Sequence, residues 1–173
     1  MGLFDSVSDV LKQYSGGGTP NTANAPDHFD QVAQAVPQDA IADGLSAVFR
    51  SNQTPAFGNL IGSLFSRSNG EQKAGVLNQL ISSVGSGGLS QLAGGGALAS
   101  LLGGATKALT PDQAQNVSPE TVQQLASHAE KTDPSIVDKA SAFYAQHPTL
   151  VKTLGGAALS IALAKVAQRQ RAA

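Results

Sequence analysis

A chain of 173 residues is long enough to bury a core and suits one domain with appendages, or two very small domains. Cysteine is absent, which excludes disulfides, thiolate nucleophiles and thiolate metal sites. Charged residues make up only 13% of the chain and the formal net charge is −1, so a role in nonspecific binding to nucleic acid is not expected.

The first predicted element is an amphipathic helix at residues 2–14. Its apolar residues recur at i, i+1, i+4, i+7, i+8 and i+11, which places them on one face of a helix. The Gly- and Pro-containing segment at 15–26 predicts a flexible linker, so the helix is expected to be tethered to the rest of the chain. Its apolar side chains are the first candidate interaction residues: Leu3, Phe4, Val7, Val10, Leu11 and Tyr14.

Further helices are predicted between residues 27 and 84 from the same apolar periodicity. The first of them ends before Pro37. Thr54 followed by Pro55 predicts an N-cap with proline at the first helical position. Ser68 with Glu71 predicts a capping box for the next helix.

Two glycines in the helix after Pro55 are spaced four residues apart, as Gly58 and Gly62. Such small residues on one helix face allow a second helix to approach closely. In a chain with no membrane-spanning pattern, this spacing favours close intramolecular packing over dimerisation in lipid.

Helix starts are the clearest local signals in the last third of the chain. Thr-Pro-Asp at 110–112 and Ser-Pro-Glu at 118–120 each combine a hydroxyl cap, a first-turn proline and an acid near the positive end of the helix dipole. Asp133-Pro134 and His147-Pro148 predict two more helix starts. The glycine-rich region at 85–104 is expected to be the loosest part of the chain, with one weak helix from Leu98 to Leu109.

The final predicted helix, which begins at residue 148, is apolar around its whole circumference and is therefore expected at the centre of the bundle or partly in an oligomer interface. Leu150, Val151, Leu154, Ala157, Ala158 and Ile161 form one of its stripes. A second stripe completes the candidate interaction residues: Leu159, Leu163 and Val166.

The sequence predicts no catalytic, cofactor-binding or metal-binding residue. The three histidines lie far apart and none has a second histidine at i+3 or i+4, so no metal site is expected: His28, His128 and His147. Neither a phosphate-loop spacing nor a G-x-S-x-G motif occurs, and no small-molecule substrate is identifiable.

A cytoplasmic location is expected, because no signal-peptide pattern is seen and no segment is long enough to span a membrane. The longest nearly uncharged apolar stretch has 12 residues, between Lys152 and Lys165. As a helix it would span ~18 Å, against the ~30 Å of a bilayer core.

Several short motifs resemble the YidB-like family of bacterial proteins. The resemblance implies an all-helical protein with no catalytic residues to carry over. It is carried by Met1-Gly2-Leu3-Phe4-Asp5 with Val7, by Gly87-Gly88-Leu89 followed by Leu92, and by Ser118-Pro119-Glu120 followed by Val122 and Leu125.

These patterns together predict an all-α, multihelical bundle of short helices with a tethered N-terminal amphipathic helix. The expected organisation is that helix at 1–14, a linker at 15–26, a helical domain at 27–170 and a tail at 171–173. A non-catalytic interaction or structural protein is favoured, with a protein partner or self-association. Two alternatives stay open, namely a peripheral membrane or envelope-associated protein anchored by the first helix, and an enzyme whose site is assembled from scattered residues.

Overall fold

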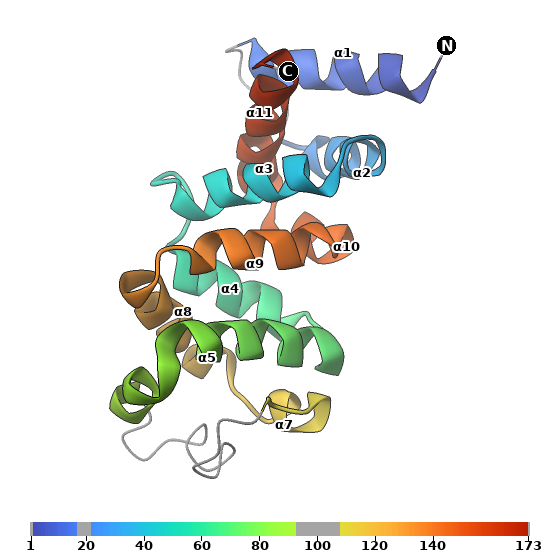
Figure 1. The fold of residues 1–173 in the computed structure, drawn as a ribbon. Coiled ribbons are helices and arrows are strands. Elements are labelled where there is room, and N and C mark those ends of the chain that lie inside the picture. The colour runs from blue at the N-terminus through green and yellow to red at the C-terminus, as the bar shows by residue number, and fades with distance from the viewer. Residues whose placement is uncertain (1, 17–21, 93–107, 173) are drawn as a thin grey trace. The chain divides into compact units, whose positions relative to one another are not determined.

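The computed structural model describes residues 2–16, 22–92 and 108–172. Within these ranges the regular structure is entirely helical, which confirms the all-α prediction. The chain divides into two compact units (Figure 1). Unit 1 comprises Met1–Thr54 with Ser141–Ala173, and unit 2 comprises Pro55–Ala140.

Unit 1 is built around its C-terminal helix. Helix α11 contacts α1, α2 and α3, which are far from it in sequence. The apolar stripes of these helices meet on α11, and this is the physical reason why the first fifty residues group with the last thirty. The elements of unit 1 are α1 (Leu3–Ser15), α2 (Ala25–Ala35), α3 (Gln38–Arg50), α10 (Pro148–Val151), the short 3-10 helix η1 (Lys152–Leu154) and α11 (Gly156–Ala172).

This division differs from the expected separate helix followed by one body at 27–170. Helix α1 belongs to the same unit as α2, α3 and α11, and residues 55–140 form a unit of their own. The glycine-rich composition of 15–26 does not determine where α1 packs.

The continuous apolar helix expected after Pro148 is wrong in its extent, because the chain is interrupted at Gly155. This residue has φ of 94°, a left-handed conformation that strongly favours glycine. The interruption separates α10 and η1 from α11. Gly156 begins α11, and a Cβ atom there would collide with the backbone carbonyl of Thr22.

Unit 2 contains α4 (Phe57–Ser66), α5 (Gly70–Leu92), α7 (Pro111–Gln115), α8 (Pro119–Thr132) and the first half of α9 (Ile136–Ala145). Helix α5 has a non-helical residue, Gly85, with φ of 71°. Helix α5 continues to Leu92, into the region expected to be loose. The weak helix expected from Leu98 to Leu109 lies mostly in 93–107, outside the described residues.

Helices α4 and α8 of unit 2 pack closely against each other. Gly58 and Gly62 are buried on α4, and a Cβ atom at either position would collide with Gln123 or Ser127 of α8. The predicted intramolecular packing of the two glycines is therefore confirmed.

Two predicted helix caps are confirmed. The Thr110 hydroxyl accepts from the Gln113 backbone N–H at 3.3 Å, while the Gln113 side chain accepts from the Thr110 N–H at 3.0 Å. The Ser118 hydroxyl accepts from the Thr121 N–H at 3.3 Å. Each bond satisfies a donor that the first turn of a helix leaves unpaired.

Two other predicted caps are wrong for one shared reason. The Thr54 hydroxyl donates to the Val48 carbonyl at 2.7 Å, and α4 begins later, after Ala56. The Ser68 hydroxyl donates to the Leu64 carbonyl at 2.7 Å. Both hydroxyls thus bond a carbonyl near the end of the preceding helix. The reciprocal cap before α5 is formed one residue later, where Asn69 and Gln72 exchange bonds of 2.9 and 3.0 Å.

Among the described residues, no helix is both long enough and apolar enough to cross a membrane.

Candidate functional site

The apolar face of α1 packs against the other helices of unit 1. Helix α1 contacts α11 and α2. The 3.6-residue repeat places its apolar side chains on the side that faces these helices. Val7, Val10, Leu11 and Tyr14 are 5–8% exposed. The side chains of Leu3 and Phe4, which belong to the same predicted set, lie outside what the structure describes.

A polar contact fixes the end of α1 on α2. The Tyr14 hydroxyl lies 2.8 Å from Nδ1 of His28, and the two rings meet edge-on with centroids 5.7 Å apart. Burial raises the pKa of the Tyr14 phenol above its ordinary value of 10.0. His28 therefore has a structural partner that no sequence pattern indicates.

The second predicted set lies inside unit 1. Leu159, Leu163 and Val166 are all fully buried on α11. Val166 lies beside Gly44 of α3, where an added Cβ would come within 3.2 Å of its methyl group. These three side chains form the interior against which the other helices of unit 1 pack.

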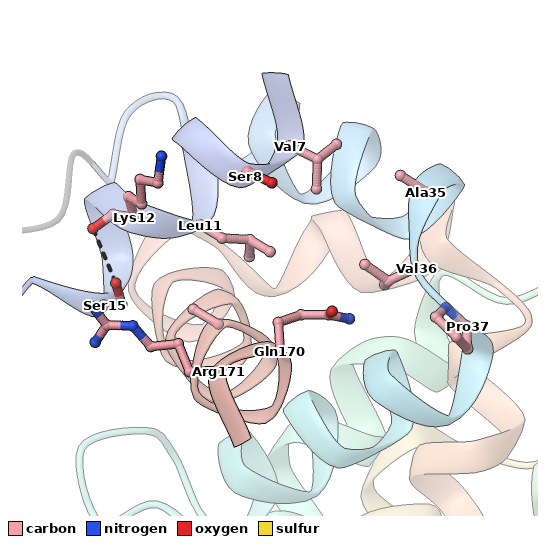
Figure 2. A pocket seen from close by; sticks show the side chains of 11 residues that line it. Val7, Ser8, Leu11, Lys12, Ser15, Ala35, Val36, Pro37, Gln170 and Arg171 are labelled. Carbon is pink, nitrogen blue, oxygen red and sulfur yellow. Dashed lines mark hydrogen bonds between the residues drawn. The ribbon is translucent and has the colours of Figure 1, made fainter. Parts of the chain in front are cut away.

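A groove lies between α1, the end of α2 and the end of α11 (Figure 2). Its cavity volume is about 410 Å³. In Figure 2, Lys12, Ser15 and Arg171 stand on one side, Val36 and Pro37 on the other, and Leu11 projects between them. The described residues that line it are Val7, Ser8, Leu11, Lys12, Ser15, Ala35, Val36, Pro37, Ala167, Gln170 and Arg171.

The groove has an uneven charge. Lys12 and Arg171 are cationic, and no carboxylate occurs among its described lining residues. Lys12 also pairs with Asp9 of the same helix at 3.3 Å, with both side chains more than 70% exposed. Arg169, two residues before Arg171, donates instead to the Asp39 carbonyl at 3.0 Å and contacts the Asp43 carboxylate.

The sequence prediction identifies only the α1 part of this groove. It does not single out Val36, Pro37, Gln170 or Arg171 as site residues. No local pattern marks them, because α2 and the end of α11 are brought together only by packing in unit 1. The excess of basic residues near the C-terminus is the one available signal, and the helix dipole alone accounts for it.

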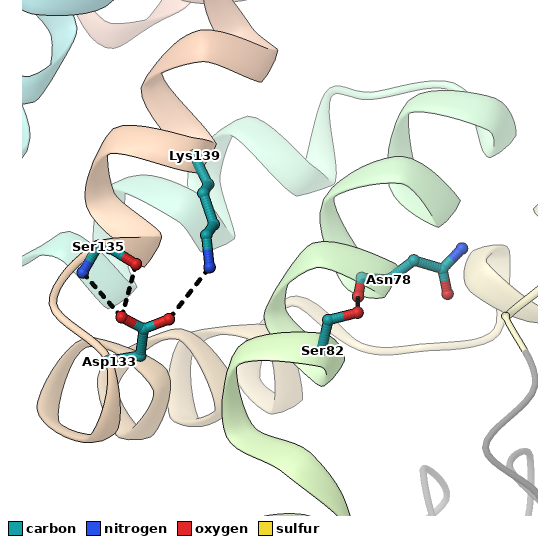
Figure 3. Close-up of polar contacts among 5 residues, drawn as sticks. All are labelled: Asn78, Ser82, Asp133, Ser135 and Lys139. Atoms are coloured by element: carbon teal, nitrogen blue, oxygen red, sulfur yellow. Dashed lines mark hydrogen bonds and ion pairs between the residues drawn. The ribbon is translucent and has the colours of Figure 1, made fainter.

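Unit 2 holds a different polar cluster, at the start of α9 (Figure 3). The Asp133 carboxylate accepts from the Ser135 hydroxyl at 2.6 Å and from the Ser135 backbone N–H at 3.1 Å. Lys139 contacts the other carboxylate oxygen at 3.1 Å. The hydrogen bond from Ser135, followed by that from Lys139, lowers the pKa of Asp133. These contacts hold the turn between α8 and α9, and α9 begins at Ile136, two residues later than the Asp133-Pro134 pattern predicts.

A second polar contact in unit 2 fixes the chain at Leu109. The Asn78 side chain accepts from the Leu109 N–H at 2.7 Å and donates to the Leu109 carbonyl at 3.2 Å. Asn78 also appears in Figure 3, where Ser82 donates to its backbone carbonyl. The contact holds residue 109 directly before α7.

The described ranges contain no group of three or more His, Asp or Glu side chains placed to hold a metal ion. In comparisons with protein-family models, curated proteins and solved structures, the chain matches none of them.

Proposed function

We propose that this chain is a non-catalytic protein-interaction protein and that its interaction surface is α1 with the adjoining groove. One observation carries the proposal. Helix α1 packs on α11 and α2 through its apolar face, and a groove remains open beside it. A docked helix next to an apolar groove is a common way to present a surface to a partner helix or peptide.

The polar clusters of unit 2 support a structural role, and not a catalytic one, for their side chains. The Ser135 hydroxyl donates to Asp133, and the Asn78 amide bonds the chain at Leu109. Both contacts complete backbone or helix-start hydrogen bonding, which leaves them no evident role as a nucleophile or a general base. The proposed kinship with the YidB-like family, supported by the shared opening Met-Gly-Leu-Phe-Asp and an all-helical fold, agrees with a non-catalytic role.

Photocrosslinking in the intact chain tests the proposal. A benzoylphenylalanine placed at the groove residue Ser8 should give a discrete adduct in cells, whereas the same probe at Ser63, an exposed serine of α4 outside the groove, should not. The partner, once identified and purified, should bind the wild type and lose affinity for Leu11→Asp. Equal adducts from both positions, or unchanged affinity of Leu11→Asp, would contradict the proposal.

Peripheral membrane association through α1 is the second candidate. The flexible composition of 15–26 and the apolar face of α1 favour it. Two observations count against it, since that face is buried on unit 1, and the exposed face carries Asp5 and Asp9 against Lys12. Interfacial helices are usually rich in Lys and Arg on the polar face.

Liposome flotation separates the two candidates. Membrane association requires the wild type to float with anionic vesicles and Phe4→Asp to remain unbound. If the wild-type protein remains in the unbound fraction, peripheral membrane association through α1 is ruled out.

A further inference from the structure

We propose that the groove of unit 1 binds a single-chain carboxylate, meaning an alkyl chain of medium length that ends in one carboxylate group. This goes beyond the proposed protein interaction, because it assigns a small-molecule ligand to a site with α1 docked. Three features of the groove carry the inference, namely its size, its apolar wall and its one-sided charge.

The size and wall of the groove suit a small amphiphile. Its volume of about 410 Å³ lies within the usual range of ligand pockets, roughly 300–1,000 Å³. Val7 and Leu11 of α1 face the groove, and Val36 and Pro37 lie across from them (Figure 2). An alkyl chain in this position would mainly cover Val36 and Pro37, because Val7 and Leu11 are only 5% and 7% exposed.

The charge lies where a terminal carboxylate would be needed. Lys12 and Arg171 lie on the same side of the groove, although the Lys12 ammonium points away from Arg171 (Figure 2). The Ser15 hydroxyl between them donates to the Lys12 carbonyl at 3.2 Å. A guanidinium group can donate two parallel hydrogen bonds to one carboxylate, and such charge-assisted bonds are among the strongest in proteins. No described lining residue supplies a competing carboxylate.

The nearby acidic residues leave the Lys12 and Arg171 side chains able to bind a ligand carboxylate. Asp9 pairs with Lys12, but both side chains are highly exposed, and such pairs contribute little. Asp43 contacts Arg169 rather than Arg171. A ligand carboxylate can therefore engage Arg171 directly and recruit the flexible Lys12.

A compact ligand fits this surface better than an acidic partner helix. Outside the groove, α1 exposes Asp5 and Asp9. A long acidic helix lying along α1 would meet these carboxylates and be repelled, whereas a ligand with one charge at the Lys12 end would not.

Titration of the full chain with sodium decanoate, below its micelle concentration, tests the proposal by amide chemical shifts and calorimetry. Binding should perturb residues of α1, the end of α2 and the end of α11. Decylammonium, which has a similar chain and the opposite charge, should bind at least about tenfold more weakly, as expected from loss of a charge-assisted contact.

Two matched variants make the test specific. Arg171→Gln and Arg169→Gln remove the same charge from the last turns of α11, but only Arg171 lines the groove. Decanoate affinity should fall about tenfold or more in Arg171→Gln and change less than about twofold in Arg169→Gln.

Several results would overturn the proposal. These are absence of decanoate binding at millimolar concentration, equal binding of decylammonium, or equal loss of affinity in both variants. Failure with decanoate leaves the Ser8 photocrosslinking result independent, so the two proposals fail separately.

Discussion

Replacing Gly58 by alanine should destabilise unit 2, whereas the same change at Gly62 should not. Both glycines face α8 from α4, but different atoms oppose them. A Cβ at Gly58 would meet the Ser127 hydroxyl and would lie 2.6 Å from the backbone carbonyl oxygen of Gln123. At Gly62 the three atoms nearest to an added Cβ all belong to the Gln123 side chain, beginning with its Cγ.

The two substitutions differ in their expected effect on stability because a side chain can move more easily than the backbone of a helix. A side chain can change rotamer, but the Gln123 carbonyl oxygen is fixed in the backbone of α8. To reach an ordinary contact of 3.4 Å from 2.6 Å, α4 and α8 must separate by about 0.8 Å at Gly58. Overpacking of this kind costs about 1–3 kcal/mol. Alanine regains about 1 kcal/mol of helix propensity at either position.

We therefore expect Gly58→Ala to lose a net ~1 kcal/mol of unfolding free energy, and Gly62→Ala to match the wild type or exceed it by up to about 1 kcal/mol. Urea unfolding followed by circular dichroism measures both, and with a denaturant slope of about 1–3 kcal/mol/M the midpoint of Gly58→Ala should fall by roughly 0.5 M. Hydrogen exchange of α4 and α8 amides assigns the loss to unit 2. The exposed Asn59→Ala on the same helix reports propensity alone.

Equal stability of the two glycine variants would refute this reasoning, whether both match the wild type or both are destabilised. In the first case the carbonyl contact would not limit the approach of the helices. In the second, the Gln123 side chain would be as rigid as the backbone.

Three further outcomes are expected. Asn78→Ala should lose about 1–3 kcal/mol, because the Leu109 N–H and carbonyl lose the amide that bonds both, and exchange of the Leu109 amide should accelerate. The folded pKa of Asp133 lies below the ordinary 3.8, so its stabilisation is present above that value and is lost as the pH falls through the folded pKa; Asp133→Asn should remove this part of the acid dependence of thermal unfolding. The pKa of Tyr14 is raised above 10.0, so its stabilisation of α1 docking is complete below pH 10.0 and is lost as the pH rises through the folded pKa; α1 amide exchange should then increase at alkaline pH in the wild type and much less in Tyr14→Phe.

Features that depend on neighbours along the chain could be predicted from the sequence. The apolar residues of α1 recur every three to four positions, and the structure places those whose side chains it describes on one buried face. Thr110 and Ser118 cap their helices because the donor that each satisfies lies three residues ahead. Such interactions need no knowledge of distant residues.

The sequence does not determine an interaction when a side chain has two possible hydrogen-bond partners. In these cases the folded structure decided which partner is used. The hydroxyls of Thr54 and Ser68 each lie between two helices, and both bond the carbonyl of the preceding one. Gly155 interrupts an apolar pattern that would otherwise predict one continuous helix. The local sequence permits either arrangement, and packing selects one.

The groove is the clearest case of a site that only packing creates. Periodicity predicts its α1 residues, whereas Val36, Pro37 and Arg171 come from segments that share no local pattern with them. Local sequence determined which side of each helix is apolar, because the helical repeat alone sets that. Which helices meet depends on apolar surface buried between residues more than a hundred positions apart, and only the tertiary structure decided that α1, α2 and α11 share one surface.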